Sequence, residues 1–278
     1  MTVESRTGVV RRFYNDAPFP GYAPHDTLTA LRARAERSQF AQLLDRAIPS
    51  DARVVEIGCG TGQMSLYLAR ASRSVVAADI AGTALQLGRD AARRFGVTSI
   101  QFVETDLHHA GLRQDFFDVV YSAGVLHHTA DPAAAFACVT RLARPGGTVV
   151  VGVYNAFGRL PLRCRRGIAR ITGFRYVPFD PILRERSRDT ARGEAWLRDQ
   201  YRHPEEHRHT IAEVKRWFAD NGVDYLRTFP STVLDDDGRD LFSRAIDDWT
   251  LEEWMAQISW IWTLGREGGL FFAIGRRR

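Results

Sequence analysis

Polar and apolar positions between residues 54 and 155 follow two alternating patterns. Short apolar runs such as VVEIG, SVVAADI and TVVVGVY predict strands, and the segments between them have the spacing of amphipathic helices. Strands are expected at 54–58, 74–80, 100–105, 117–122 and 147–154, and helices at 62–71, 84–95 and 131–143. Because the runs are apolar at consecutive positions, both sheet faces should be covered, as in a parallel sheet flanked by helices.

The flanking segments extend this alternation and interrupt it twice. Residues 27–47 have helical spacing, whereas 9–25 combine aromatic residues with three prolines and are expected to form an irregular arm. The pattern stops after Asn155 for about 55 residues. It resumes with a capping box at Thr210–Glu213, and a second capping box opens at Thr250. Two further strands are expected, at 223–229 and 269–275.

These elements predict an α/β fold with a doubly wound, Rossmann-like, seven-stranded and mostly parallel sheet that carries helical cap insertions. The expected organisation is an N-terminal arm or lid (1–26), a core (27–155), an arginine-rich cap insertion (156–209) and the end of the core (210–278) with a helical insertion (230–268). The insertions leave from the ligand-binding edge of the sheet. With the arm, they are expected to converge over one enclosed pocket.

The sharpest motif is a glycine-rich turn between the first strand and the next helix. Its pattern is E-x-G-x-G-x-G, running from Glu56 through Gly58 and Gly60 to Gly62. Glycines let the backbone approach a ligand closely, and a helix N-terminus offers unpaired N–H groups. A dinucleotide-binding site typically has the pattern G-x-G-x-x-G, but in this sequence the third glycine position is occupied by Gln63. A carboxylate at position 56 suits an ammonium group better than a pyrophosphate.

Two further acidic residues end the following strands. Asp79 lies 21 residues after Gly58, where a carboxylate can reach ribose hydroxyls. Asp106 ends the third strand and can accept from an adenine amino group. Together with the glycine turn, these acids predict a nucleoside ligand that carries an amine.

These residues resemble the class I S-adenosylmethionine-dependent methyltransferases, over residues 27–155 and again over 210–275. VVEIGCGTG is similar to their first motif, and Asp79 and Asp106-Leu107 to their ribose and adenine positions. FDVVYSAGVLHHTADP and LARPGGTVVVG are similar to their fourth- and fifth-strand motifs. The resemblance implies S-adenosylmethionine as cofactor, S-adenosylhomocysteine as product and no metal. It implies this set of cofactor-binding residues: Glu56, Gly58, Cys59, Gly60, Gln63, Asp79, Ile80, Asp106, Leu107, Ser122 and Tyr14.

Candidate residues for the methyl acceptor follow the fourth and fifth strands. His127 and His128 stand where related small-molecule methyltransferases place a base or an orienting histidine, and Tyr154 is a third catalytic candidate. In the alternative reading, one histidine only caps a helix or bonds backbone. The residues expected to contact substrate are Tyr22, Asn155, Tyr201 and His203. Tyr14, Phe19 and Tyr22 are lid candidates whose rings tolerate a sulfonium charge, or else they belong to a packed arm.

Positive charge is concentrated in one insertion. Residues 156–209 hold 13 Arg against 7 Asp plus Glu, while the rest of the chain has 25 basic and 26 acidic residues. This segment could attract an anionic substrate or a carrier protein, or it could be a solvated helical surface. Since the core itself is not basic, no nucleic-acid partner is expected.

Two further patterns have ordinary explanations. The H-x-x-E-H sequence from His203 to His207 matches some zinc sites, but Pro204 favours a helix start there, which would leave His203 at the cap. Tryptophans at 249, 254, 260 and 262 are expected to form buried cap core. A wall for a flat aromatic substrate and a homodimer interface are the alternatives.

Composition limits the class of protein. The 278 residues include three cysteines without C-x-x-C spacing, no apolar run of membrane-spanning length and no hydrophobic leader, so we expect a cytoplasmic protein with no membrane partner. Lys215 is the only lysine, which indicates the codon bias of a GC-rich bacterium. The expected activity is methyl transfer to an oxygen or nitrogen of a small metabolite, either anionic or aromatic, as in secondary metabolism. Methylation of protein or RNA and a non-catalytic regulator that binds S-adenosylmethionine are the alternatives.

Overall fold

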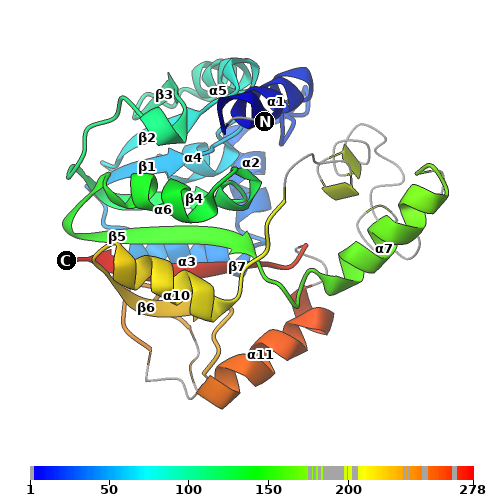
Figure 1. The fold of residues 1–278 in the computed structure, drawn as a ribbon. Coiled ribbons are helices and arrows are strands. Elements are labelled where there is room, and N and C mark those ends of the chain that lie inside the picture. The colour runs from blue at the N-terminus through cyan, green and yellow to red at the C-terminus, as the bar shows by residue number, and fades with distance from the viewer. Residues whose placement is uncertain are drawn as a thin grey trace.

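A computed structural model describes residues 3–174, 206–233, 238–245, 250–264 and 268–278, together with 177, 180, 183, 197, 198, 200, 201 and 236. Its centre is a seven-stranded sheet with the order β3-β2-β1-β4-β5-β7-β6 (Figure 1). The strands are β1 (Arg53–Ile57), β2 (Ser74–Asp79), β3 (Ile100–Glu104), β4 (Phe117–Ala123), β5 (Ala143–Tyr154), β6 (Val223–Phe229) and β7 (Leu270–Arg277).

The sheet confirms the predicted fold class. Pairings among β1 to β5 are parallel, whereas β7 runs antiparallel to both β5 and β6. The parallel strands all end at the same edge, and their order reverses between β1 and β4. Ligands of doubly wound sheets bind outside the strand ends at such a reversal.

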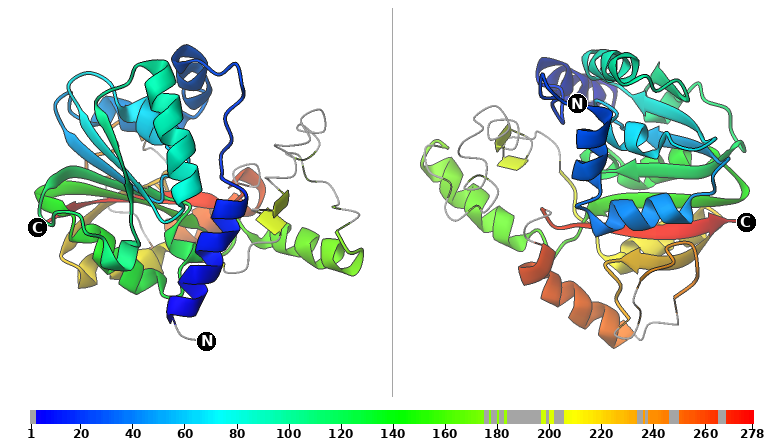
Figure 2. Two further views of the ribbon diagram at one scale, coloured as in Figure 1. Left: turned by 90° about the horizontal axis from the view of Figure 1, so that it is seen from above. Right: turned by 180° about the vertical axis from the view of Figure 1, so that it is seen from behind.

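Helices cover both faces of this sheet (Figure 2). One face packs against α6 (Pro132–Thr140) and α10 (Ile211–Asp220), which bury Phe136, Trp217 and Phe218. The other face packs against α3 (Gln39–Ala47) and α4 (Gln63–Leu68), and α5 (Gly82–Phe95) packs along β2 and β3. The consecutive apolar positions of the strands are therefore buried on both sides, as the sequence pattern predicted.

Two predicted elements differ from the structure. The segment expected to be an irregular arm begins as a helix, α1 (Val3–Asp16), because its prolines come only from Pro18 onward. The single helix expected over 27–47 is divided into α2 (Leu28–Ala35) and α3. The break occurs where Ser38 adopts an extended conformation and accepts a hydrogen bond from the N–H of Ala41.

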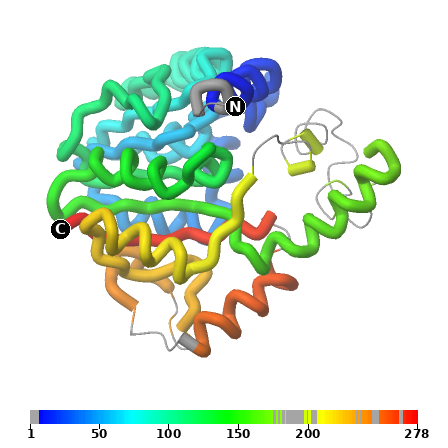
Figure 3. Tube along the Cα trace, in the orientation of Figure 1, coloured from blue at the N-terminus to red at the C-terminus, as the bar shows by residue number. Residues whose placement is uncertain are grey.

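The two insertions contribute helices outside the sheet layers. From the end of β5, α7 (Leu160–Ile171) runs away from the core, and α11 (Thr250–Thr263) begins at the predicted capping box (Figure 3). The tryptophans of α11 were expected to be buried, which holds for Trp260 but not for Trp254 and Trp262. Trp249 lies outside the described residues. No described helix is long and apolar enough to cross a bilayer.

Candidate active site

The turn after β1 brings three glycines into left-handed backbone conformations. Gly58, Gly60 and Gly62 have φ values of 75°, 54° and 75°. A Cβ atom at Gly58 would lie 2.0 Å from Val125 Cγ2, and one at Gly60 would lie 2.2 Å from the carbonyl oxygen of Phe19. Glycine is therefore needed both for the turn and for the close approach of two other segments.

The carboxylate at the end of β2 is fixed against this turn. Asp79 Oδ2 accepts a hydrogen bond from the N–H of Gly60 at 2.7 Å, and Oδ1 accepts one from the N–H of Ala81 at 2.8 Å. Burial raises the pKa of Asp79, although these backbone donors oppose the shift. A carboxylate held from both sides can accept a pair of ligand hydroxyls without reorienting.

A second carboxyl group, Glu56, is buried beside the turn. It accepts a hydrogen bond from the hydroxyl of Ser65 and is only 6% exposed. Burial raises the pKa of Glu56 to about 8, and the charge of Asp79 adds to the shift. A bound cation would stabilise the ionised form of this buried carboxyl group, so Glu56 is suited to pair with the ammonium group of a ligand.

These groups open into one cavity of about 510 Å³, a volume typical of small-molecule sites. It contains most of the residues that the sequence predicted for the cofactor and two that it predicted for catalysis. The predicted residues in the lining are Tyr14, Glu56, Gly58, Cys59, Gly60, Gln63, Asp79, Ile80, Asp106, Leu107, His128 and Tyr154.

Tyr154 lines the cavity together with His128 and Gln200. His128 lines the cavity, whereas His127 lies fully buried behind it and stacks on the Tyr154 ring, with centroids 3.8 Å apart. The Tyr154 hydroxyl accepts a hydrogen bond from Gln200 Nε2 at 2.9 Å, and Gln200 also lines the cavity. A ring-stacked phenol, an amide and an imidazole thus face the same space.

The segment after α1 closes over the glycine turn. The hydroxyl of Tyr22 donates to the carbonyl oxygen of Thr61 at 2.8 Å, and the Thr61 hydroxyl donates to the carbonyl oxygen of Pro20 at 2.6 Å. Gln63 Nε2 donates to the carbonyl oxygen of Gly21 at 2.9 Å. Three hydrogen bonds therefore hold the N-terminal segment against the turn that would carry the ligand.

Comparison with known proteins identifies the fold around this cavity. Residues 55–151 match a protein family described as a methyltransferase domain. This part of the chain, which surrounds the cavity, is therefore similar to a methyltransferase domain. The matched range runs from β1 to β5, so it contains the glycine turn, Asp79, both histidines and most of β5.

Curated proteins are similar to this chain over part of their length. An uncharacterised protein of Synechococcus is 29% identical over 63% of this chain and 48% of its own length. A ubiquinone biosynthesis O-methyltransferase of Cereibacter sphaeroides is 33% identical over 42% of this chain and 48% of its own length. This chain thus spans about half the length of the first curated relatives it matches.

A solved structure shows a similar fold over the whole chain. The magnesium protoporphyrin IX methyltransferase of Synechocystis, crystallised with S-adenosylhomocysteine, superposes with a TM-score of 0.58 and 16% identity. The match covers 98% of this chain and 100% of the other. The similarity in fold therefore extends beyond residues 55–151, the range that the family model matches.

Other predicted site residues lie outside the described cavity lining. Ser122 donates to the carbonyl oxygen of Ile57 between two strands, at 3.0 Å. The Asn155 side chain accepts from two backbone N–H groups of the next turn and donates to Gln257, and the Tyr201 hydroxyl donates to Asp180 at 2.6 Å. These three side chains therefore form hydrogen bonds within the protein and are absent from the described cavity lining. His203 lies outside the described residues.

Sequence reasoning missed several lining residues of the methyltransferase domain's cavity. Gln200 comes from the arginine-rich insertion, and Thr7 and Val10 come from α1, a helix that the sequence analysis did not predict. The excess of arginine pointed to the insertion but not to Gln200. The Gln200 side chain reaches Tyr154 across 46 residues of sequence, a separation that no periodic pattern reveals.

Proposed function

We propose that this protein transfers a methyl group from S-adenosylmethionine to an oxygen or nitrogen atom of a small-molecule metabolite. The observation that carries the proposal is one cavity whose lining combines the glycine turn and the carboxyl groups of Glu56 and Asp79 with the side chains of His128 and Tyr154. Donor and acceptor sites must adjoin for direct transfer between two bound molecules, because proximity supplies much of the rate.

The residues present fit the cofactor. Burial raises the pKa of Glu56, and the α-ammonium group of the bound cofactor would stabilise its ionised carboxylate. Asp79, fixed by two backbone donors, would accept from the ribose hydroxyls, and Asp106 lines the cavity where it would accept from the adenine amino group. Gly58 and Gly60, which line the cavity, would present the backbone of the turn to the ligand. When bound, S-adenosylmethionine supplies an electrophilic methyl group.

His128 is the residue that we assign to the acceptor's proton. It lies in the short helix η2 (Leu126–His128), which follows β4, and it lines the same cavity as the residues proposed to bind the cofactor. An imidazole can take a proton from a hydroxyl or amine near neutral pH as the acceptor attacks. His127 would act indirectly, because it is stacked behind Tyr154.

A small acceptor is supported by the way the cavity is covered. Tyr14 and Phe19 of the N-terminal segment and Gln200 of the insertion all contribute to its lining. A cover assembled from two separate parts of the chain outside the sheet suits a metabolite better than a polymer. The O-methyltransferase among the relatives is named for ubiquinone biosynthesis, which agrees with this class of substrate.

The proposal is tested with donor that carries a labelled methyl group. The full chain is incubated with labelled S-adenosylmethionine and a bacterial cell extract, which is then separated into small-molecule, protein and RNA fractions. We expect enzyme-dependent label in the small-molecule fraction and none with Asp79→Ala, while Asp90→Ala on the exposed face of α5 should behave as wild type. Label in protein or RNA would overturn the substrate class, and donor binding without transfer would indicate a regulator.

A further inference from the structure

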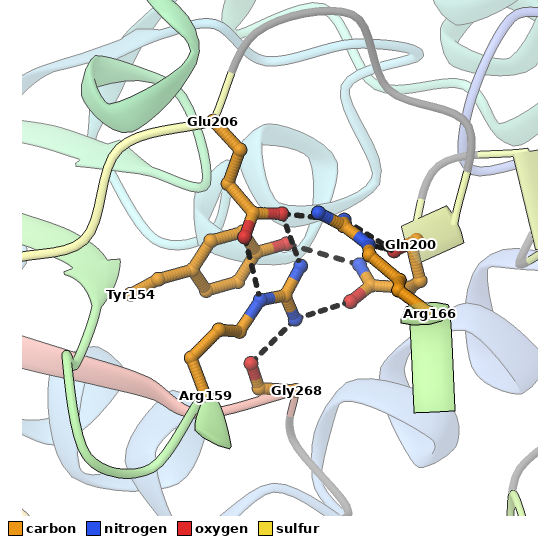
Figure 4. Close-up of polar contacts among 6 residues, drawn as sticks. All are labelled: Tyr154, Arg159, Arg166, Gln200, Glu206 and Gly268. Carbon is orange, nitrogen blue, oxygen red and sulfur yellow. Dashed lines mark hydrogen bonds and ion pairs between the residues drawn. The ribbon is translucent and has the colours of Figure 1, made fainter. Parts of the chain in front are cut away.

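The start of the basic insertion places several arginines around one carboxylate. Arg159, Arg163 and Arg166 are spaced i, i+4 and i+7 at the beginning of α7, so they share one face of the helix. The carboxylate of Glu206 accepts from Arg159 at 2.8 and 3.3 Å and from Arg166 at 2.5 Å (Figure 4). Glu206 therefore pairs with two of these three guanidinium groups, and the third, that of Arg163, is exposed on the same helix face.

A further arginine, Arg208, belongs to the segment that follows Glu206. The rings of His207 and His209 in this segment lie 6.4 Å apart and nearly parallel, as alternate side chains on one face of an extended chain do. Glu206 and Arg208 therefore share the opposite face, which meets α7 through the ion pairs of Glu206. We call the guanidinium groups gathered here the arginine cluster: Arg159, Arg163, Arg166 and Arg208.

The positive charge of the arginine cluster is only partly balanced. Burial lowers the pKa of Arg208, and the nearby charge of Arg163 lowers it further. Arg166 and Arg159 act in the same direction, while Glu206 opposes them. Among the ion pairs between described residues, none includes Arg163 or Arg208. Four guanidinium groups and one carboxylate therefore leave an excess of positive charge, which an anionic ligand would offset.

The arginine cluster adjoins the cavity. Arg166 donates from Nε to the backbone carbonyl oxygen of Gln200 at 2.7 Å, and Gln200 contributes to the cavity lining. The guanidinium carbon of Arg159 lies 3.5 Å from the centroid of the Tyr154 ring, and Tyr154 also lines the cavity. Two lining residues thus contact the cluster directly. A molecule bound in the cavity beside them has to extend past only one residue to reach the arginines.

The chemistry of the arginine cluster favours a phosphate group over a carboxylate. Guanidinium groups bind phosphate oxygens through paired hydrogen bonds, and several of them can share one phosphate. A phosphate monoester carries about 1.5 to 2 negative charges near pH 7, so it offsets more of the excess positive charge than a carboxylate with a single charge. The exposed Arg163 and the half-buried Arg208 are the members that a ligand can reach from solvent.

We propose that Arg163 and Arg208 bind a phosphate group of the methyl acceptor, while the oxygen or nitrogen that receives the methyl group lies in the cavity beside His128. The inference rests on the proposed function, because it names the substrate class of the same cavity, a small phosphate ester. Arg159 and Arg166 add positive charge to this site. The excess of arginine in the insertion thus serves the recognition of an anionic acceptor.

Direct binding is measured with inorganic pyrophosphate and the full chain saturated with S-adenosylhomocysteine. Isothermal titration calorimetry should show that wild type binds pyrophosphate, and that acetate binds about tenfold more weakly at the same ionic strength. Arg163→Gln and Arg208→Gln should each weaken pyrophosphate binding about 10- to 100-fold, the usual cost of losing hydrogen bonds to a charged group. Arg216→Gln removes the same charge from the exposed face of α10 and should keep the wild-type affinity.

The phosphate of the acceptor is tested on the labelled product. The full chain is incubated with labelled S-adenosylmethionine and cell extract, and the labelled small molecules are passed over an anion-exchange resin. We expect the resin to retain the label, and to release it after treatment with phosphodiesterase and alkaline phosphatase. Arg163→Gln should raise the extract concentration that gives half-maximal rate without lowering the maximal rate, while the affinity for S-adenosylhomocysteine stays unchanged.

Equal pyrophosphate affinity in wild type, Arg163→Gln and Arg208→Gln would overturn the proposed site. A labelled small molecule that the resin does not retain, or that stays on the resin after phosphatase treatment, would overturn the phosphate class. These results leave the proposed function standing, because label still enters a small molecule. Absence of label from the small-molecule fraction would overturn the proposed function and this inference together.

Discussion

At the scale of single residues, the fold gives two glutamates opposite ionisation behaviour. Glu206 lies between two guanidinium groups, which lower its pKa to about 2. Glu56 accepts from the hydroxyl of Ser65, and burial raises its pKa to about 8. The first is ionised near neutral pH and pairs with Arg159 and Arg166. The second is suited to become an anion only when a cationic ligand is bound.

This difference predicts that cofactor affinity depends on pH. Below its pKa of about 8, Glu56 must lose a proton before it can pair with an ammonium group. The dissociation constant for S-adenosylhomocysteine should therefore fall by up to about tenfold for each pH unit from 6 to 8 and then level off. Isothermal titration calorimetry across this range measures it, with proton release seen in buffers of different ionisation enthalpy.

Glu56→Gln is the control for this dependence, because the amide cannot ionise. It should bind more weakly than wild type and lose most of the slope. In the ligand-free wild type, the raised pKa of Glu56 favours the protonated folded state, so stability is lost as pH rises from about 4.5 to about 8. A flat affinity profile, or an equal slope in Glu56→Gln, would contradict this role for Glu56.

His128 makes a separate prediction about the rate. His128→Ala should lower methyl transfer about 10²- to 10⁴-fold, the usual contribution of a general base, while S-adenosylhomocysteine still binds. The rate is followed as label that enters the small-molecule product of the wild-type reaction. His25→Ala, an exposed position, is the matched control. A rate within a fewfold of wild type would mean that positioning alone accounts for the transfer.

At the scale of elements, the sequence was most informative where a motif sits between a strand and a helix. The run from Val54 to Gln63 predicted strand, turn and helix, and the structure has β1, the glycine turn and α4 there. It was least informative for α1, because the aromatic residues and nearby prolines of residues 9–25 predicted an irregular arm in place of a helix. That helix supplies Thr7, Val10 and Tyr14 to the cavity, so an error about one element also concealed part of the site.

The hydrogen bonds between the N-terminal segment and the glycine turn predict that this segment slows ligand release. Tyr22→Phe removes the donor to the Thr61 carbonyl, a bond worth about 0.5–1.5 kcal/mol. Dissociation of S-adenosylhomocysteine should become about 2- to 10-fold faster in stopped-flow experiments. Tyr225→Phe should leave the rate unchanged. An unaltered rate in Tyr22→Phe would show that the segment does not retain the ligand.

At the scale of the whole molecule, the doubly wound, mostly parallel sheet and its ligand-binding edge were predicted from the alternation of strands and helices. The placement of the two insertions was not. Both were expected to cover the cavity, but the described residues of 230–268 contribute nothing to its lining. Gln257 of α11 instead accepts a hydrogen bond from the Asn155 side chain. Contacts such as Arg159–Gln200 join distant segments, and single-sequence periodicity carries no information about them.

The proposed methyl transfer requires one cavity to hold the methyl donor beside His128 and Tyr154. A crystal structure of the full chain with S-adenosylhomocysteine tests it most directly. We predict the ligand's ammonium group at Glu56, its ribose at Asp79 and its sulfur facing His128 and Tyr154. A ligand bound elsewhere, or one whose sulfur faces away from His128 and Tyr154, would contradict the proposed methyl transfer.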